Sequence, residues 1–207
     1  MENIMESKQW YAQNYDCTDT FSQLIPDLEG TELVTSSLSR KTSVSISDIE
    51  AFCKQHGISK SSFFIGIYGY LLAKYNNDQE TLFGIVDRDD ADGQQVEAFP
   101  IYAKMADDTT VSDYLKAIEQ LTAGCREHKA YTIMDVLGDL NLQLGSYFAW
   151  NGQAKDFAEL DVPLYVMASV EDGNCLVAAA YHANLYSQQL VGQFLESYEA
   201  AAAGFLQ

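Results

Sequence analysis

The histidines are the side chains of this sequence best suited to move protons near neutral pH. There are three, His56, His128 and His182, and their spacing forms neither H-x-x-x-H nor H-E-x-x-H. His56 stands directly before Gly57, which favours a cation at a helix C-terminus over a catalytic base. Cys125 lies three residues before His128, so a thiolate pair is an alternative to a core thiol. We expect no catalytic residue from these patterns.

The cysteines and one acidic loop are the other groups that could hold a metal ion. The loop from Asp87 to Gly93 alternates aspartates as a calcium loop does, but it lacks the EF-hand spacing and the closing glutamate. A solvated loop is therefore favoured. The four cysteines lie far apart without a C-x-x-C pair, which favours buried reduced thiols over disulfides or zinc. They are Cys17, Cys53, Cys125 and Cys175. We expect no metal site and no directly bound cofactor.

Charge and length limit the classes of protein to consider. The chain has 207 residues, with 12 Lys and Arg against 30 Asp and Glu, and a net charge of −18. Nucleic acids and anionic membranes are bound through Lys and Arg, so this balance argues against both as partners. The longest apolar run, 63–73, is shorter than the ~18 residues of a membrane span. The N-terminus, MENIME, lacks the pattern of a signal peptide, so we expect one cytoplasmic domain.

Hydrophobic periodicity and turn residues predict the order of the elements that must position any site. An N-terminal helix is expected around Trp10 and Tyr11, followed by a loop that carries Pro26 and Gly30. The patterns then predict an arm over 32–46, helices over 47–56 and 61–75, strands over 82–86 and 96–105, helices over 110–125 and 132–140, strands over 147–150, 163–170 and 175–181, and a helix from Ser187. A mixed β-sheet flanked by helices fits this order, so the fold class is α/β.

Local signals predict how some of these elements begin and face. Ser47 to Glu50 has the pattern of a capping box. Pro100 predicts that its strand lies at a sheet edge or contains a bulge. In the short helix over 132–140, we expect Met134 and Leu137 to face inward.

Two stretches carry the strongest motifs of the chain. The stretch 49–75, IEAFCKQHGISKSSFFIGIYGYLLAKY, is similar to a pair of helices with the pattern L..LA..HG.T.f..llaa.a.lL.ry. The stretch 81–88, TLFGIVDR, is similar to a strand with the pattern d.vvGtpvanR, and Gly84 and Arg88 occupy the matching places.

Weaker motifs follow in the same order. HKAYTIMD, over 128–135, is similar to HQdyPFe, with His128 and Tyr131 at its motif positions. The stretch 148–151 is similar to the strand vmfn, and YHANL, over 181–185, to Yd..lf. With their order and spacing, these motifs resemble the C-terminal lobe of a condensation domain of nonribosomal peptide synthetases, in the chloramphenicol-acetyltransferase-like superfamily. The resemblance makes 1–207 one such lobe, without the N-terminal lobe that carries HHxxxDG.

This resemblance implies a reaction and its partners. Condensation domains join a donor acyl thioester to an acceptor amine, and both substrates are tethered to phosphopantetheine arms of peptidyl carrier proteins. A C-terminal lobe would supply one wall of the tunnel, contacts to carrier proteins and to adjoining synthetase domains, and a surface for the N-terminal lobe. Such a role is positioning and water exclusion rather than proton transfer. The implied wall residues are Arg88, Tyr147, Trp150 and Asn151. A separated lobe exposes its former partner face, so we also expect weak homo-oligomers.

Departures from the family pattern leave alternatives open. The stretch 96–102, VEAFPIY, lies where the family has iGffvNt, with Glu97 in place of its glycine and Ile101 in place of its asparagine. Thr132 stands in place of the proline of HQdyPFe. One alternative is a noncatalytic interaction module derived from such a lobe. Another is an acyl-CoA-dependent acyltransferase, which needs a histidine with an aspartate four residues later, and none of the three histidines has one.

Overall fold

The computed structural model describes residues 2–16, 20–88, 96–160, 162–171 and 173–207. The helices and strands follow the predicted order, with one short 3₁₀ helix that the patterns did not predict. They are α1 Glu2–Asn14, β1 Thr35–Ser45, α2 Ile46–His56, α3 Lys60–Tyr75, β2 Glu80–Arg88, β3 Val96–Lys104, α4 Val111–Glu127, α5 Ile133–Leu140, β4 Tyr147–Trp150, η1 Ala154–Glu159, β5 Leu164–Glu171, β6 Asn174–His182 and α6 Gln188–Phe205. The expected α/β class is confirmed.

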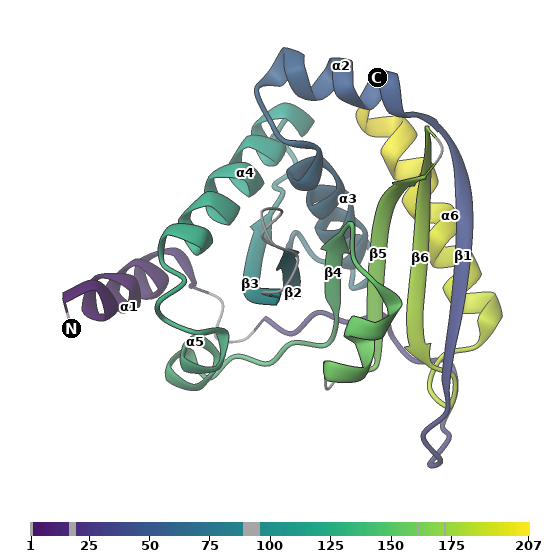
Figure 1. Cartoon of the computed structure of the whole chain (residues 1–207), viewed down its shortest axis with the longest axis horizontal. Helices are drawn as coiled ribbons and strands as arrows, with labels where there is room; N and C mark the ends of the chain where they lie inside the picture. Colours follow the sequence, from purple (N-terminus) through teal and green to yellow (C-terminus); the bar gives the residue numbers. More distant parts are fainter. Residues whose placement is uncertain (1, 17–19, 89–95, 161, 172) are drawn as a thin grey trace.

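One mixed sheet forms the centre of the molecule (Figure 1). Its strand order is β1-β6-β5-β4-β2-β3. The three central strands β5, β4 and β2 are parallel, whereas β3, β6 and β1 run antiparallel to their neighbours. The sheet therefore has two edge strands, β1 and β3. Pro100 lies in β3, so its predicted edge position is confirmed, because proline cannot donate to a second neighbour.

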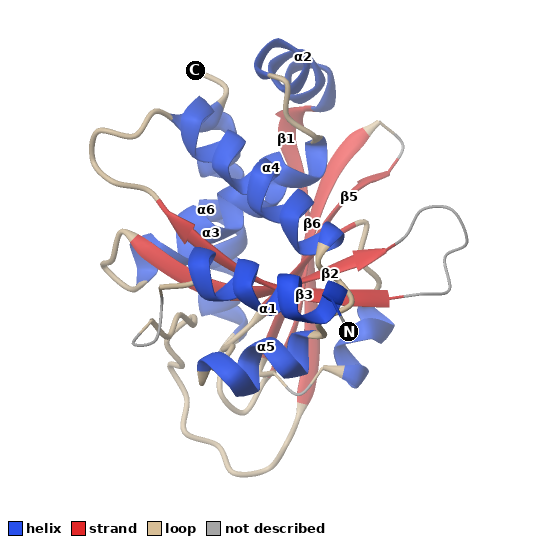
Figure 2. Ribbon diagram, turned by 90° about the vertical axis from the view of Figure 1, so that its left-hand side faces the viewer, coloured by secondary structure: helices blue, strands red, loops and turns tan. Residues whose placement is uncertain are grey.

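The two faces of the sheet are covered unequally. Helices α3, α4 and α6 pack on one face, and the view in Figure 2 shows them on the same side of the strands. Successive residues of β4 alternate between the faces, as the period of a strand requires: Phe148 belongs to the large core under the helices, and Tyr147 and Ala149 belong to a smaller cluster on the opposite face. We call these the helix face and the second face.

The start of α2 differs from the sequence prediction. The N-cap is Ser45 and not Ser47: the Ser45 hydroxyl accepts a hydrogen bond from the backbone N–H of Asp48 at 3.3 Å. The capping box at Ser47 was therefore wrong. The reason is that β1 passes directly into the helix at Ile46, so the last extended residue of the strand is the one placed to cap. The helix ends as predicted, with Gly57 in the left-handed conformation at φ +69°.

The orientation of α5 also corrects a prediction. Met134 is 73% exposed, so the expectation that it faces inward was wrong, and Leu137 is half-buried. Val136 is the fully buried residue of this helix. Because α5 has only eight residues and is capped by Thr132, its core-facing side is set by the chain that enters and leaves it rather than by its own periodicity.

The described residues include three of the four cysteines and all the helices that could be tested as membrane spans. Cys53, Cys125 and Cys175 are buried and free, and burial raises the pKa of each. Cys17 lies outside the described residues, as does most of the acidic loop over 87–93. In the part of the chain that the structure describes, no helix has both the length and the apolar character needed to cross a bilayer.

Candidate functional site

The second face is built around two tyrosines on neighbouring parallel strands. Tyr147 of β4 lies beside Tyr165 of β5, and both are almost fully buried. Their other neighbours in the cluster are mostly small or flexible apolar side chains from the sheet and from η1: Val86, Ala149, Phe157, Val162, Met167 and Ala180. The 3₁₀ helix η1 covers part of this cluster and lies beside β4 and β5 in Figure 1, and Ile133, Leu144 and Leu160 pack against the cluster as well.

Gly84 and Tyr147 depend on one another. The strands β2 and β4 place these residues opposite each other, and a Cβ built on Gly84 would lie 2.2 Å from the Tyr147 ring. The glycine therefore makes room for the tyrosine to lie flat across β2. Burial raises the pKa of Tyr147 to about 12, so its hydroxyl stays protonated at neutral pH.

Tyr165 is held by η1. Its hydroxyl donates to the Asp156 carboxylate at 3.1 Å, and Asp156 also accepts from the backbone N–H of Gln153 at 3.0 Å. The next residue, Phe157, meets the ring of His182 edge-on at 5.4 Å. These contacts attach the 3₁₀ turn to β5 and β6. Sequence reasoning missed this element, and the signal that could have indicated it is the spacing of Gln153 and Asp156, which forms its cap.

The predicted wall residues do not form one cluster. Trp150 lies on the helix face, where its ring stacks on Phe64 at 4.6 Å and 9°. It is therefore on the opposite side of the sheet from Tyr147. Asn151 follows directly, exposed, at φ +55°, and its backbone N–H donates to Ala168 at 2.7 Å. Arg88 is the last residue of β2, paired with Val96, and its side chain is outside the description.

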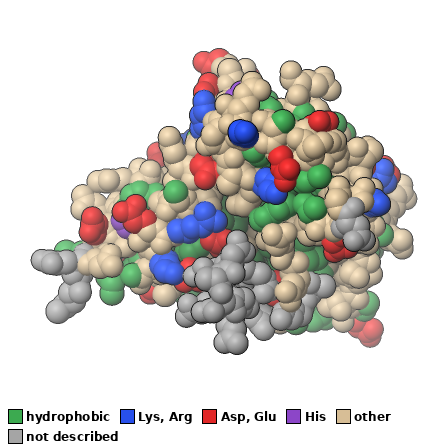
Figure 3. Space-filling view, turned by 45° about the horizontal axis from the view of Figure 1, so that its top comes forward, with side chains coloured by type: hydrophobic (Ala, Val, Ile, Leu, Met, Phe, Trp, Pro, Cys, Tyr) green, Lys and Arg blue, Asp and Glu red, His purple; other side chains and the backbone are tan. Residues whose placement is uncertain are grey.

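The carboxyl ends of the parallel strands nonetheless bring part of this set to one edge. β2 ends at Arg88, β4 at Trp150 and β5 at Glu171, and parallel strands end at the same edge of a sheet. Ligands of open α/β sheets bind at this kind of edge. In the view of Figure 3, hydrophobic side chains gather in a patch with acidic and basic ones around it. The position of the carboxyl edge is thus the reason to consider it for binding.

The histidines have structural partners. His128 caps α4, stacks on Trp10 at 4.9 Å, and its Nδ1 lies 3.2 Å from the Ser7 hydroxyl. Because Ser7 donates its own proton to the Asn3 carbonyl at 2.8 Å, it accepts from His128 and is not activated as a nucleophile. His56 lies at the end of α2, 2.9 Å from the Ser112 hydroxyl, as a residue of the predicted helix C-terminus.

Cys125 and Tyr131 also have packing roles. The Cys125 sulfur lies 3.3 Å from the Tyr15 hydroxyl and points its thiol at the Pro100 carbonyl, which favours the core-thiol alternative over a pair with His128. Tyr131 donates to Asp139, and burial together with that carboxylate raises its pKa to about 12. Among the residues that the structure describes, no three His, Cys, Asp or Glu side chains come together in a way that could hold a metal ion.

Comparison with solved structures shows what this arrangement of sheet and helices is. The SgcC5 protein of Streptomyces globisporus matches 100% of the chain with a TM-score of 0.82 at 9% identity. The condensation domain of the monacolin K polyketide synthase MokA matches 99% with a TM-score of 0.77 at 14% identity. The matches span 56% and 57% of those two chains. The chain has the fold of one lobe of a condensation domain.

A curated relative agrees with this fold. A nonribosomal peptide synthetase, sidC, of Arthroderma benhamiae is 22% identical over 200 residues, which is 84% of this chain and 4% of that protein. No known family profile matches the chain. In this lobe, the second face and the carboxyl edge of β2, β4 and β5 lie outside the cover of α3, α4 and α6. They are the candidate functional site.

Proposed function

We propose that the chain acts as the C-terminal lobe of a nonribosomal peptide synthetase condensation domain, which joins carrier-bound aminoacyl or peptidyl thioesters to an amine. The observation that carries this proposal is the match of 99–100% of the chain to about half of several solved condensation domains. The order of the sequence motifs supports the C-terminal assignment. The substrates and the partners of the lobe are part of the proposal.

The histidine environments support a role without proton transfer. Each of the three histidines packs against an aromatic ring, and two of them hydrogen bond to a serine. We therefore assign the proton-handling histidine to the HHxxxDG motif of an N-terminal lobe. This lobe contributes position and water exclusion, which reduce the entropic cost of bringing two tethered reactants to the transition state.

The wall residues are assigned by their place in the fold. Tyr147 lies buried on the second face, Asn151 is exposed directly after β4, and Arg88 ends β2 at the same edge of the sheet. Trp150 supports this edge from the helix face through its stack on Phe64. In the proposal, the phosphopantetheine arm of a peptidyl carrier protein reaches this edge as the tether of the substrate, and adjoining synthetase domains hold the carriers nearby.

A fusion enzyme tests the proposal. An N-terminal condensation lobe with HHxxxDG is joined to residue 1, and dipeptide formation from two aminoacyl carrier proteins is followed by mass spectrometry. We expect product from the fusion, none from the chain alone, and none when the second His of the motif is changed to Ala. Product from the chain alone, or a folded two-lobe fusion without any product, would contradict the proposal.

A matched pair of asparagines tests the wall. Asn151 and Asn141 both have positive φ, 55° and 52°, so glycine at either position keeps the backbone conformation. Asn141 ends α5, away from the carboxyl edge. In the fusion, Asn151→Gly is expected to lower the rate about tenfold, whereas Asn141→Gly leaves it unchanged. Equal rates for both variants would remove Asn151 from the wall.

A further inference from the structure

The strand β1 has a free edge. It lies at the end of the sheet order and pairs only with β6. The Ala183 N–H donates to the Val34 carbonyl at 2.6 Å, and hydrogen-bonded residues alternate along an antiparallel strand. Even-numbered residues from Val34 to Arg40 therefore point their backbone groups at β6. Thr35, Ser37, Ser39 and Lys41 point theirs outward, and no described residue bonds to these outward groups.

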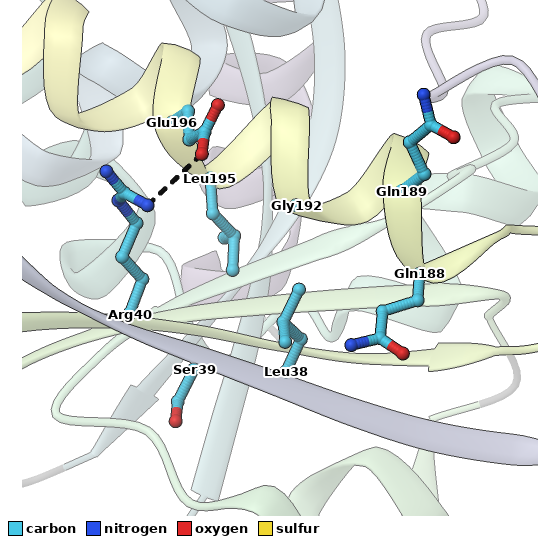
Figure 4. A pocket seen from close by; sticks show the side chains of 8 residues that line it. All are labelled: Leu38, Ser39, Arg40, Gln188, Gln189, Gly192, Leu195 and Glu196. Carbon is cyan, nitrogen blue, oxygen red and sulfur yellow. Dashed lines mark hydrogen bonds and ion pairs between the residues drawn. The ribbon is translucent and has the colours of Figure 1, made fainter.

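A groove runs beside this edge, between β1 and α6. We call it the edge groove, and its volume is about 550 Å³. Its lining residues are Leu38, Ser39, Arg40, Gln188, Gln189, Gly192, Leu195 and Glu196. Figure 4 shows Leu38 and Arg40 pointing toward the helix and Ser39 pointing away from it. The groove exists because Gly192 has no side chain: a Cβ there would meet only Leu38, at 3.7 Å.

We propose that two copies of this chain associate through their β1 strands, antiparallel, about a two-fold axis at Leu38. In this register Ser37 faces Ser39 of the second copy, and Thr35 faces Lys41, so all four outward residues form narrow hydrogen-bonded pairs. Four such pairs with two bonds each give about eight backbone hydrogen bonds. The six-stranded sheet becomes continuous across the axis.

The side chains on the helix face match this axis. Leu38 is the one apolar side chain in the uniformly paired segment Thr35–Lys41, and it would meet Leu38 of the second copy in a non-hydrogen-bonded pair, where side chains are closest. Each edge groove then receives the leucine of the other copy. The contact is isologous, which closes the assembly at two copies.

The helix α6 is complementary about the same axis. Leu38 lies nearest Gly192, so the two copies of α6 would cross antiparallel near their glycines. One turn to either side, Glu196 then faces Gln188 of the second copy, and Leu195 faces Gln189. A carboxylate meets an amide that can donate to it, and the two Glu196 side chains stay apart. The pairing of Glu196 with Gln188 and of Leu195 with Gln189 needs a second copy of α6, so it favours a second copy of this chain as the partner.

Charge also favours a second copy at this place. The chain carries −18, so most surfaces of two copies repel each other. The segment Thr35–Ser39 has no charged residue, and Arg40 and Lys41 follow it. Arg40 is already paired with Glu196 and Glu199 of its own chain, at 3.2 and 2.8 Å. Two copies can therefore meet here without placing acidic residues against each other.

Light scattering of the purified chain at rising concentration tests this association. We expect the mass to increase from 23.0 kDa toward twice that value, 46.0 kDa, and to increase further when salt screens the net charge. Ser39→Pro removes an outward N–H at a position where an edge strand tolerates proline, and should weaken association about tenfold or more. Ser39→Ala keeps the N–H and should associate like the original chain.

A monomer at about 1 mM, or a folded Ser39→Pro variant that associates unchanged, would overturn the proposal. If Ser39→Pro does not fold, oxidative cross-linking decides. Leu38→Cys places two Cα atoms about 4.5 Å apart across the axis, within the range of a disulfide. Ser36→Cys faces Arg40 of the other copy and lies about 13 Å from its own counterpart. We expect covalent dimers from Leu38→Cys only; equal yields from both variants would overturn the register.

Discussion

The two faces of the sheet are built from the same strands but carry different kinds of side chain. On the helix face, large rings pack without solvent contact: Phe64, Tyr68, Phe148 and Tyr198 are all buried, and Phe148 stacks near both tyrosines. On the second face, glycine and alanine alternate with two tyrosines and one short turn covers them. The difference shows that a large aromatic core packs under the helices, whereas the second face carries a smaller cluster beside η1.

The largest difference between the faces is expected on truncating a phenylalanine. Phe148→Ala removes a fully buried ring under the helices and should lower the free energy of unfolding by about 3–5 kcal/mol. Phe157→Ala removes a ring that only η1 lays on the second face, and should cost about 1–2 kcal/mol. Urea unfolding measures both. A larger cost for Phe157→Ala would reverse the comparison.

A second effect concerns the close approach on the second face. Gly84→Ala forces the Tyr147 ring to move and should lower the free energy of unfolding by about 1–3 kcal/mol. In the presence of Tyr147→Ala the same substitution should cost much less, so the double-mutant cycle gives a coupling of about 1 kcal/mol or more. Additive costs would show that the two residues do not depend on each other.

A third effect compares the hydroxyls of two tyrosines of α3, one buried and one half-buried. Tyr68 donates to Ser146 at 2.6 Å beneath the helices, and both residues are fully buried. Tyr68→Phe should lower the free energy of unfolding by about 1–2 kcal/mol, because it leaves the Ser146 hydroxyl without that donor. The control is Tyr70→Phe, on the half-buried outer side of α3, which should change the free energy of unfolding by less than about 0.5 kcal/mol. Equal effects would remove the special role of the Tyr68 hydrogen bond.

The smallest effect is a pH dependence at the edge of the helix face. Glu199 accepts from the Ser43 hydroxyl and backbone N–H, both at 2.7 Å, and these bonds with Arg40 lower its pKa to about 2. A lowered folded-state pKa stabilises the fold above the unfolded value near 4.5, and this stability is lost as pH falls toward 2. Glu199→Gln should therefore flatten the pH dependence of the melting temperature between about pH 5 and 2. An unchanged curve would contradict this assignment.

Sequence reasoning succeeded where the deciding residues are close together in the chain. Two of the predicted helices were expected to begin at Thr110 and Ser187, and these residues are the N-caps of α4 and α6, because a cap bonds to a backbone group three residues away. Ser45 was missed because its role as a cap depends on the strand that precedes it. The separation of Tyr147 from Trp150 was available from the sequence: three residues along a strand reach the opposite face.

The rest of the site depends on contacts between distant residues. The space above Gly84 is filled by Tyr147 only after β2 and β4 pair in parallel, and nothing local to either residue specifies that pairing. The same holds for Asp156 and Tyr165, since η1 has neither the length nor the period of a helix that patterns detect. The free edge of β1 likewise follows from the strand order.

Activity of the chain with and without an N-terminal lobe tests the central claim most directly. The account predicts that two aminoacyl carrier proteins yield a dipeptide with the fusion described above, and that the purified chain by itself yields none at equal concentration. The only imidazoles of the chain are those of His56, His128 and His182. Amide formation by the chain alone would contradict the claim that this lobe positions a reaction whose proton transfer occurs elsewhere.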